Sequence, residues 1–187
     1  MFKMSAVIES GIASYSKYLE QELRSDHAGE TGAVYIYKGI IAVATLLKDQ
    51  ELIHFAKEHG ATEAEHLQLI EAVFERKYRS RLLGPWRIAG WLTGAIPALF
   101  GRKAVYATIA AVETFVEQHY QEQINYLKKH GGHEQLLDLL IRCQADEIGH
   151  KNEARSKASP SLPLALRAWC AMVGSGSATA VLLAKRI

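Results

Sequence analysis

The chain has 187 residues and a formal net charge of +2, which suits a single domain. Hydrophobic residues make up 49% and charged residues 22%, so disordered and collagen-like chains are excluded. With so small a net charge, binding to nucleic acid or to a membrane would need a local patch. Two cysteines, Cys143 and Cys170, are too few for a disulfide scaffold or a multi-thiolate zinc site, and they fit a reducing compartment.

The N-terminus and the apolar runs bear on targeting. No signal peptide is expected, because Glu9 interrupts the short apolar stretch that follows Lys3. The longest runs free of charged residues cover 88–101 and 168–184. A membrane-spanning helix needs about 20 apolar residues, so we expect no transmembrane helix, while an interfacial segment stays compatible with the sequence.

Apolar residues recur at helical spacing in five stretches, and no stretch has a strand or hairpin pattern. The spacing predicts helices over 23–44, 50–78, 103–130, 133–157 and 164–185. Gly131 and Gly132 mark the end of the third helix, and two prolines, Pro160 and Pro163, separate the last two helices. The sequence therefore predicts an all-α protein.

Each of the first four helices carries a glutamate near the middle of its apolar face, and two of them also carry a histidine. Unpaired buried carboxylates are costly, so this pattern needs a positive group between the helices. The ionisable residues repeat: the two lone glutamates are separated by 83 positions, and the two Glu-x-x-His pairs by 84. The six residues are Glu30, Glu63, His66, Glu113, Glu147 and His150.

Two Glu-x-x-His pairs plus one glutamate from each remaining helix form the ligand set of ferritin-like carboxylate bundles with two metal ions. Four carboxylates balance two divalent cations, and oxygen-rich ligation with one imidazole per metal favours iron or manganese over zinc. The predicted fold is a ferritin-like four-helix bundle of two pseudo-repeated hairpins, with a crossover insert at 76–103 and a fifth helix. It covers 23–187 and follows an N-terminal extension at 1–22.

Other polar residues receive predictions of their own. Asp146 is expected to orient His66, and Asp26 or another group to orient His150. Tyr37 and Tyr120 are either core aromatics or residues of a substrate pocket or an electron path. Glu65 and Glu71 are expected to be solvated, and four histidines are expected at the surface or at helix ends rather than as ligands: His54, His59, His130 and His133. Glu117 is expected as a rim charge, with support of the ligands as the alternative. Cys143 is expected as a packing residue, with a place in the pocket lining as the alternative.

Four segments resemble the demethoxyubiquinone hydroxylase family of ubiquinone biosynthesis: LRSDHAGETGAVYIY (23–37), EAEH (63–66), AAVETFVEQHY (110–120) and DEIGHKNEA (146–154). The resemblance implies a di-iron centre held by the six residues above, with Glu63 and Glu147 as bridging candidates. It implies hydroxylation of a polyprenylated benzoquinol ring with dioxygen, using electrons from NADH or through the quinol itself. His119 and Tyr120 match a pair implicated in that electron path.

The insert supports a lipid substrate independently of the resemblance. Residues 76–87 contain five basic residues and no acid, and the apolar run IAGWLTGAIPALFG follows. Basic flanks around a short apolar segment, with Trp86 and Trp91 as interfacial aromatics, favour docking to an anionic membrane surface. A crossover helix buried against the bundle or a second subunit is also compatible. We expect a peripheral protein on the cytoplasmic face of a bacterial membrane, or on the matrix face of the mitochondrial inner membrane.

Three other functions are weighed against this hypothesis. A di-iron hydroxylase of a modified tRNA nucleoside would use the basic stretch for phosphates, but nucleic acid offers nothing to the adjacent apolar run, so no nucleic-acid partner is expected. Non-enzymatic iron handling would favour a polar exterior. A metal-free lipid carrier would leave the inward glutamates unexplained. A homo-oligomer and a lipid-presenting partner protein are compatible with the hydroxylase, although no motif specifies them.

Overall fold

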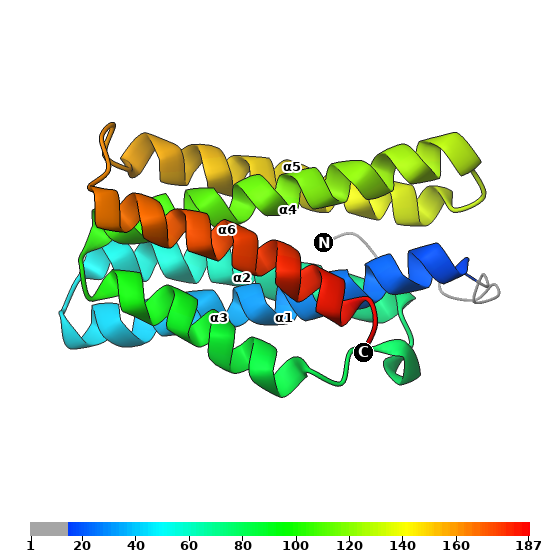
Figure 1. Cartoon of the computed structure of the whole chain (residues 1–187), viewed down its shortest axis with the longest axis horizontal. Coiled ribbons are helices and arrows are strands. Elements are labelled where there is room, and N and C mark those ends of the chain that lie inside the picture. The colour runs from blue at the N-terminus through cyan, green and yellow to red at the C-terminus, as the bar shows by residue number, and fades with distance from the viewer. Residues whose placement is uncertain (1–14) are drawn as a thin grey trace, which may run out of the picture.

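The computed structural model describes residues 15–187, so the expectation of no signal peptide and most of the predicted N-terminal extension lie outside the described residues. The described chain is all-helical, as predicted, and the helices follow one another as drawn in Figure 1. They are α1 (Lys17–Leu46), α2 (Gln50–Val73), the short 3-10 helix η1 (Arg76–Tyr78), α3 (Leu83–Ala98), α4 (Arg102–His130), α5 (Glu134–Lys157) and α6 (Leu164–Ala184).

The helix ends follow local chemistry. α1 begins at Lys17, six residues before the predicted start, because the Ser16 hydroxyl accepts a hydrogen bond from the Leu19 backbone N–H at 3.3 Å. α2 ends at Val73, before the predicted limit of 78, because Phe74 is extended and buries its ring in the core. α4 ends before Gly131, as predicted, and the Gly131 N–H donates to the Leu127 carbonyl at 2.8 Å.

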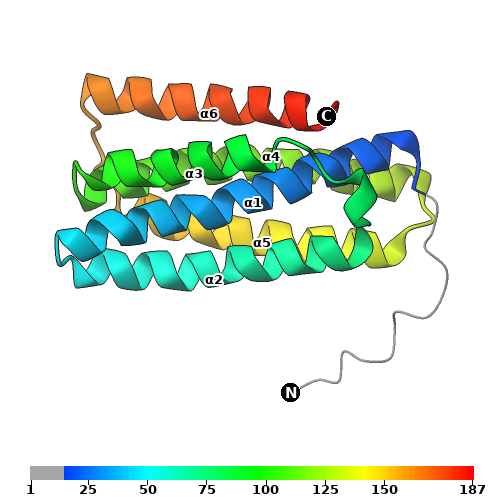
Figure 2. The same cartoon turned by 90° about the horizontal axis from the view of Figure 1, so that it is seen from below.

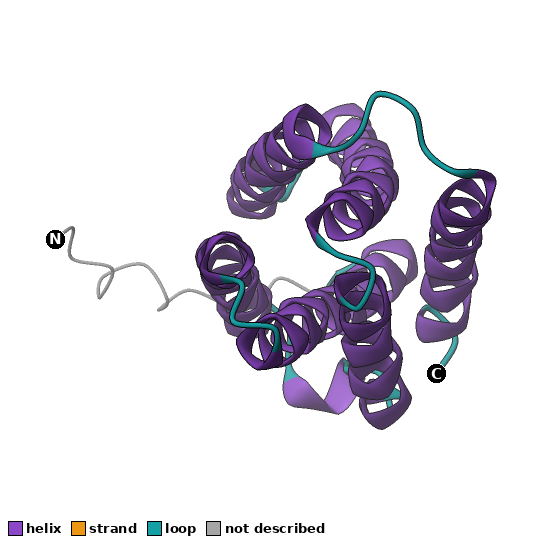
Figure 3. Ribbon diagram, turned by 90° about the vertical axis from the view of Figure 1, so that its left-hand side faces the viewer, coloured by secondary structure: helices purple, strands orange, loops and turns teal. Residues whose placement is uncertain are grey.

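The helices form two hairpins with two additional helices on one side. α1 pairs with α2 and α4 pairs with α5, and in Figure 2 the helices α2 and α5 lie on the side opposite α6. α3 packs along α1, while α6 packs mainly along α4, which the view down the bundle in Figure 3 also shows. The predicted crossover insert thus contains a helix, α3, which agrees with the crossover helix that the sequence left as an alternative.

The apolar core is divided into two clusters along the bundle axis. One contains Tyr37, Ile40, Phe55 and Ile109, and the other contains Leu23, Ile70, Tyr120 and Leu140, with further neighbours in each. In every helix of the two hairpins, the predicted ionisable residues fall between these clusters in sequence. The core therefore encloses a polar layer at mid-height.

α3 lies unusually close to α1 because glycines form the contact. A Cβ atom on Gly39 of α1 would collide with the Trp91 carbonyl oxygen, and one on Gly94 of α3 would collide with the Ile36 carbonyl oxygen. Both obstacles are backbone atoms, which cannot move aside as a side chain can. The insert is thus a fixed wall of the bundle.

α6 differs from what the sequence predicted. Among the described residues, α6 is the one helix that is long enough and apolar enough to cross a membrane, judged by length and composition. The sequence indicated no such helix. The sequence predicted a helix over nearly the same residues, 164–185, but judged its ability to span a membrane from the charge-free run 168–184 alone, which excludes Leu164 and Arg167. Only two of its residues, Val173 and Ala184, are buried, so α6 presents a largely exposed apolar surface.

Candidate metal centre and adjoining pocket

The six predicted residues meet in the polar layer at mid-bundle. All have exposed fractions of 9% or less. They form two groups, and within each group the potential ligand atoms lie within 4.8 Å of one another. One group is Glu30, Glu63, His66 and Glu147, and the other is Glu63, Glu113, Glu147 and His150. The two groups share Glu63 and Glu147, the pair that the resemblance suggested as bridging residues.

Histidines and carboxylates pair across the two hairpins. His66 Nδ1 of α2 lies 3.1 Å from Glu147 Oε1 of α5, and His150 Nδ1 of α5 lies 3.1 Å from Glu63 Oε1 of α2. This exchange follows from the repeat, because each Glu-x-x-His pair projects both of its side chains from one face of its helix. Packing the two faces together sets each imidazole against the carboxylate of the opposite helix.

The charges of the cluster are strongly perturbed. Burial raises the pKa of Glu30 to about 7, with the Glu147 charge acting in the same direction. Burial and the Glu147 charge also raise the pKa values of Glu63 and Glu113 well above the ordinary range. Burial acts to raise the pKa of Glu147 as well, but the neighbouring imidazoles of His150 and His66 outweigh it and lower that pKa to about 2. Without a cation, the cluster therefore retains protons near neutral pH.

Four buried atoms of the cluster make no hydrogen bond among residues 15–187, although His150 Nδ1 and Glu63 Oε1 lie within 3.1 Å of each other: Glu30 Oε2, Glu63 Oε1, Glu147 Oε2 and His150 Nδ1. Unpaired buried acceptors are costly and rare in folded proteins. Four carboxylates and two imidazoles form an oxygen-rich donor set that suits two iron or manganese ions. The residues present thus fit a pair of divalent cations.

Two buried tyrosines hold carboxylates of the opposite hairpin. The Tyr37 hydroxyl of α1 donates to Glu113 Oε1 of α4 at 3.4 Å, and the Tyr120 hydroxyl of α4 donates to Glu30 Oε1 of α1. The sequence left two roles open for both tyrosines: core aromatics, or residues of a substrate pocket or an electron path. Each is in fact a core residue whose hydroxyl reaches the cluster, and Tyr120 also lines the pocket described below.

The residues around the two imidazoles were partly predicted. Asp146 Oδ2 lies 3.1 Å from His66 Nε2, in the contact expected for it. The suggestion that Asp26 supports His150 is wrong, because Asp26 Oδ1 accepts from His119 Nε2 at 3.0 Å and from Gln123 at 2.8 Å. The assignment of His59 to the surface is also wrong, since its exposed fraction is 3% and its ring stacks on His150.

The remaining predictions concern residues outside the cluster. Cys143 is fully buried, which agrees with a packing role. Glu65 and Glu71 are both exposed, as predicted; Glu65 is bonded to Arg142, and Glu71 contacts the buried His27 at 3.0 Å. Glu117 lies at the edge of the bundle, paired with Lys151. The sequence made no prediction for His27, which is buried on the inward face of α1 one turn before Glu30.

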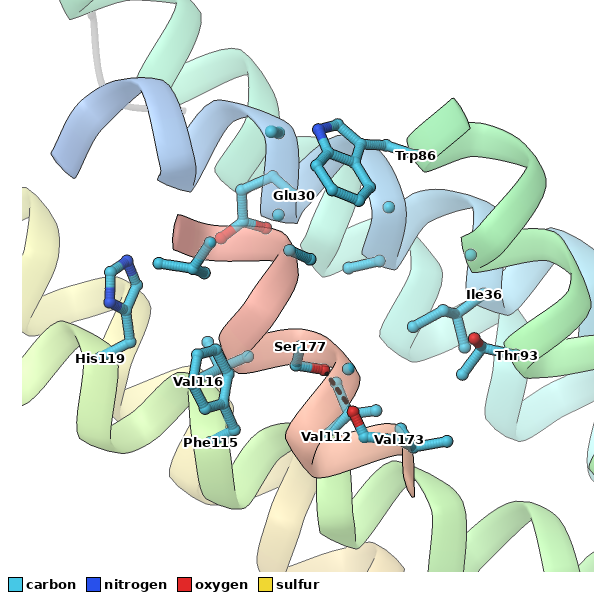
Figure 4. A pocket seen from close by; sticks show the side chains of 18 of the residues that line it. Glu30, Ile36, Trp86, Thr93, Val112, Phe115, Val116, His119, Val173 and Ser177 are labelled. Carbon is cyan, nitrogen blue, oxygen red and sulfur yellow. Dashed lines mark hydrogen bonds between the residues drawn. The ribbon is translucent and has the colours of Figure 1, made fainter. Parts of the chain in front are cut away.

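A cavity of about 370 Å³ adjoins the cluster. Its walls come from α1, α3, α4 and α6, and Figure 4 shows Glu30 and His119 at one side, with Trp86, Phe115 and Val173 around it. Glu63, Glu113 and Glu147 also line the cavity, so it extends to the carboxylates. Most of the lining is apolar or small, as suits a hydrophobic molecule that reaches the cluster.

The fold and the cluster together define a ferritin-like helical bundle with a carboxylate–histidine site beside an apolar cavity. The family model described as "Ubiquinone biosynthesis protein COQ7" matches residues 17–184. The chain belongs to this family, as the resemblance in the sequence indicated.

Relatives of the chain carry hydroxylase names. "NADPH-dependent 3-demethoxyubiquinone 3-hydroxylase, mitochondrial" of Dictyostelium discoideum is 32% identical over 172 residues, which cover 90% of this chain and 77% of the relative. "3-demethoxyubiquinol 3-hydroxylase" of Rhodospirillum rubrum is 32% identical over 186 residues, covering 95% and 82%. The protein with the same name from Legionella pneumophila is 29% identical over 157 residues, covering 83% and 71%.

Proposed function

We propose that this protein is a monooxygenase of ubiquinone biosynthesis that hydroxylates the ring of a demethoxyubiquinol or demethoxyubiquinone with dioxygen. The observation that carries the proposal is the direct contact between an apolar cavity and the six-residue cluster. The names of relatives in Dictyostelium and Rhodospirillum support the same reaction.

In this proposal the six residues of the cluster would hold two iron ions, with Glu63 and Glu147 available to both ligand groups. When bound, the iron pair supplies the activation of dioxygen that amino-acid side chains cannot perform. The protein holds the ligands in place: Tyr120 and Tyr37 fix one carboxylate each, and Asp146 fixes the His66 ring. Burial keeps bulk water away from the reacting ring.

The volume and the apolar lining of the cavity suit the proposed substrate. A substituted quinone ring with the first part of its isoprenoid chain suits an apolar space of about 370 Å³. The remaining chain would leave between α3 and α6, both of which expose large apolar residues such as Ile88, Leu92 and Met172. The apolar lining suits a prenylated ring better than the polyanionic substrate of a tRNA hydroxylase.

The exposed apolar surface of α3 and α6 would face the membrane that contains the substrate, with the basic stretch 76–87 near the lipid headgroups. The protein would then bind peripherally, on the cytoplasmic face of a bacterial membrane or the matrix face of a mitochondrial one. A lipid-presenting partner protein would deliver the substrate to the same surface, and a homo-oligomer is compatible with this arrangement.

Electrons would come from a reduced nicotinamide or through the quinol. The sequence suggested NADH, while several mitochondrial relatives are named NADPH-dependent. His119 lines the cavity and is held by Asp26 and by the Ser25 hydroxyl, which lies 3.1 Å from His119 Nε2. It is therefore placed to meet a donor or a ring oxygen at the cavity wall.

The test is a hydroxylation assay with the iron-loaded chain, a short-tailed demethoxyquinone and dioxygen, run separately with NADH and NADPH. Formation of the hydroxylated ring, identified by mass spectrometry, is the expected result. A chain that binds two irons and oxidises the nicotinamide without hydroxylating the ring would contradict the proposed substrate.

A further inference from the structure

The two imidazoles of the cluster are supported in different ways. His66 is anchored by a carboxylate, because its Nε2 lies 3.1 Å from Asp146 Oδ2 while its Nδ1 faces the cluster. In the repeat, the position equivalent to Asp146 is Thr62, whose hydroxyl instead donates to the Glu58 backbone carbonyl at 3.5 Å. His150 therefore lacks the carboxylate anchor that His66 has.

His59 occupies the place beside His150. The two rings stack with their centroids 4.1 Å apart and their planes 27° from parallel. In the repeat, the position 84 residues after His59 is that of Cys143, so this ring too has no counterpart in the second hairpin. The first hairpin thus supplies the ring that stacks on His150, whereas the second supplies the carboxylate that contacts His66.

The His59 ring is itself fixed from several directions. Its Nε2 lies 3.0 Å from Glu153 Oε2 of α5, and its Nδ1 lies 3.4 Å from the Tyr37 hydroxyl of α1. The Phe55 ring packs against it with centroids 4.1 Å apart. A ring that is held on several sides in this way can orient the imidazole that stacks on it.

We infer that His59 is a positioning residue for His150. Because a stacked ring supports His150 whereas the Asp146 carboxylate supports His66, the two metal positions are chemically unequal. The inference rests on the proposed metal centre. A carboxylate hydrogen-bonded to a ligating histidine raises the basicity of the imidazole and strengthens metal binding, typically by about 10- to 100-fold. The stacked ring orients His150 without this gain. The metal beside Glu113 and His150 is therefore released first, and the metal beside Glu30 and His66 is retained longer.

The inference is tested by metal release from the full chain, loaded anaerobically with two Fe(II) per chain and mixed with a chelator in excess. The wild-type protein is expected to release its iron in two phases of equal amplitude. His59→Ala should accelerate the fast phase by about tenfold or more and leave the slow phase unchanged. Asp146→Ala should accelerate the slow phase alone, and His59→Phe, which keeps a stacked ring, should restore the fast phase to near the wild-type rate.

A spectroscopic readout separates positioning from general loosening. The Mössbauer spectrum of the ⁵⁷Fe(II) protein should contain two doublets, and His59→Ala should shift only one of them. Equal acceleration of both phases, or no change in either, would overturn the inference even though two irons are bound. If His59→Ala lowers the helix content, His59→Gln replaces it, with the same expected result. A wild-type chain that binds no iron would instead overturn the proposed metal centre, and the inference with it.

Discussion

At the scale of single residues, the chemistry depends on carboxylates that would be unstable in the core without a partner. Glu147 is the residue most closely tied to the others, because it belongs to both ligand groups and contacts both imidazoles. Its position one helical turn before His150 was evident from the sequence. The contact of His66 with Asp146 was also predictable, since it needed only that the two Glu-x-x-His faces meet.

Contacts across helices that lie outside the repeat could not be predicted. His59 and His119 both lie on inward faces, but their partners depend on the rotation and axial offset of one hairpin against the other. The sequence repeat fixes which residues are equivalent, whereas it does not fix which neighbours of those residues touch. His59 was therefore assigned to the surface, and Asp26 was paired with the wrong histidine.

Replacing Glu147 by Gln tests the shared ligand. Loss of one negative charge and of a bridging oxygen pair should lower the iron content well below two per chain and reduce hydroxylation by about 100-fold or more. Iron is counted by mass spectrometry after anaerobic purification. The matched control is Glu65→Gln, two positions from Glu63 on the exposed face of α2, which should keep full iron content. An iron-replete Glu147→Gln chain with normal turnover would refute the assignment.

The pKa shifts predict a pH dependence for the metal-free protein. Burial raises the pKa of Glu30 to about 7. Burial acts to lower the pKa of His66, but the hydrogen bond with Glu147 and the Glu30 charge raise it to about 9. For both groups the folded state binds more protons than the unfolded state, so their contributions to stability are present at low pH and are lost as pH rises through these values.

The metal-free chain should therefore melt at a lower temperature near pH 9 than near pH 6, as followed by circular dichroism. Bound cations replace the protons, so the loaded chain should be much less sensitive over this interval. A metal-free melting temperature that rises between these two pH values would contradict the protonated cluster described above.

At the scale of helices, the sequence predicted five of the six α-helices and their approximate limits because their apolar spacing is regular, whereas it gave α3 no limits of its own. The sequence placed the end of α2 at 78, beyond the observed end at Val73. The difference could not be predicted, because only tertiary packing draws Phe74 out of the helix and into the core. The sequence predicted the limits of α6 but did not indicate that this helix is long and apolar enough to cross a membrane, because a search for charge-free runs stops at Arg167. The close approach of α3 to α1 depends on glycines whose role becomes visible only when the two backbones are placed together.

The α1–α3 contact can be tested with one added methyl group. Gly39→Ala should destabilise the fold by about 1–3 kcal/mol, because the new Cβ would collide with the Trp91 carbonyl oxygen. Gly174→Ala in α6, where no atom lies within 4 Å of an added Cβ, should be neutral or slightly stabilising. Both are measured by urea unfolding, and equal effects of the two substitutions would contradict the close packing.

At the scale of the whole molecule, three features follow one another in space from the bundle interior to one side of the protein. They are the polar cluster, the apolar cavity and the exposed faces of α3 and α6. This order joins a proposed metal centre to a proposed membrane surface through the space where the substrate would bind. The opposite side, formed by α2 and α5, is rich in ion pairs such as that of Arg142 with Glu65.

The membrane surface is tested by flotation with vesicles that contain anionic lipid. The double substitution Ile88→Glu and Leu92→Glu places charges on the exposed face of α3 and should reduce vesicle binding strongly. Ile141→Glu, at a comparably exposed apolar position on α5, is the matched control and should bind like the wild-type protein. Undiminished binding of the α3 variant would exclude this face as the membrane contact.

The central claim is that the six-residue cluster holds two iron ions, and anomalous diffraction at the iron edge tests it most directly. Crystals grown from iron-loaded protein should contain two anomalous peaks, one between Glu30 and His66 and one between Glu113 and His150, with Glu63 and Glu147 contacting both. A single peak, peaks elsewhere on the chain, or an empty cluster in iron-replete crystals would contradict the account.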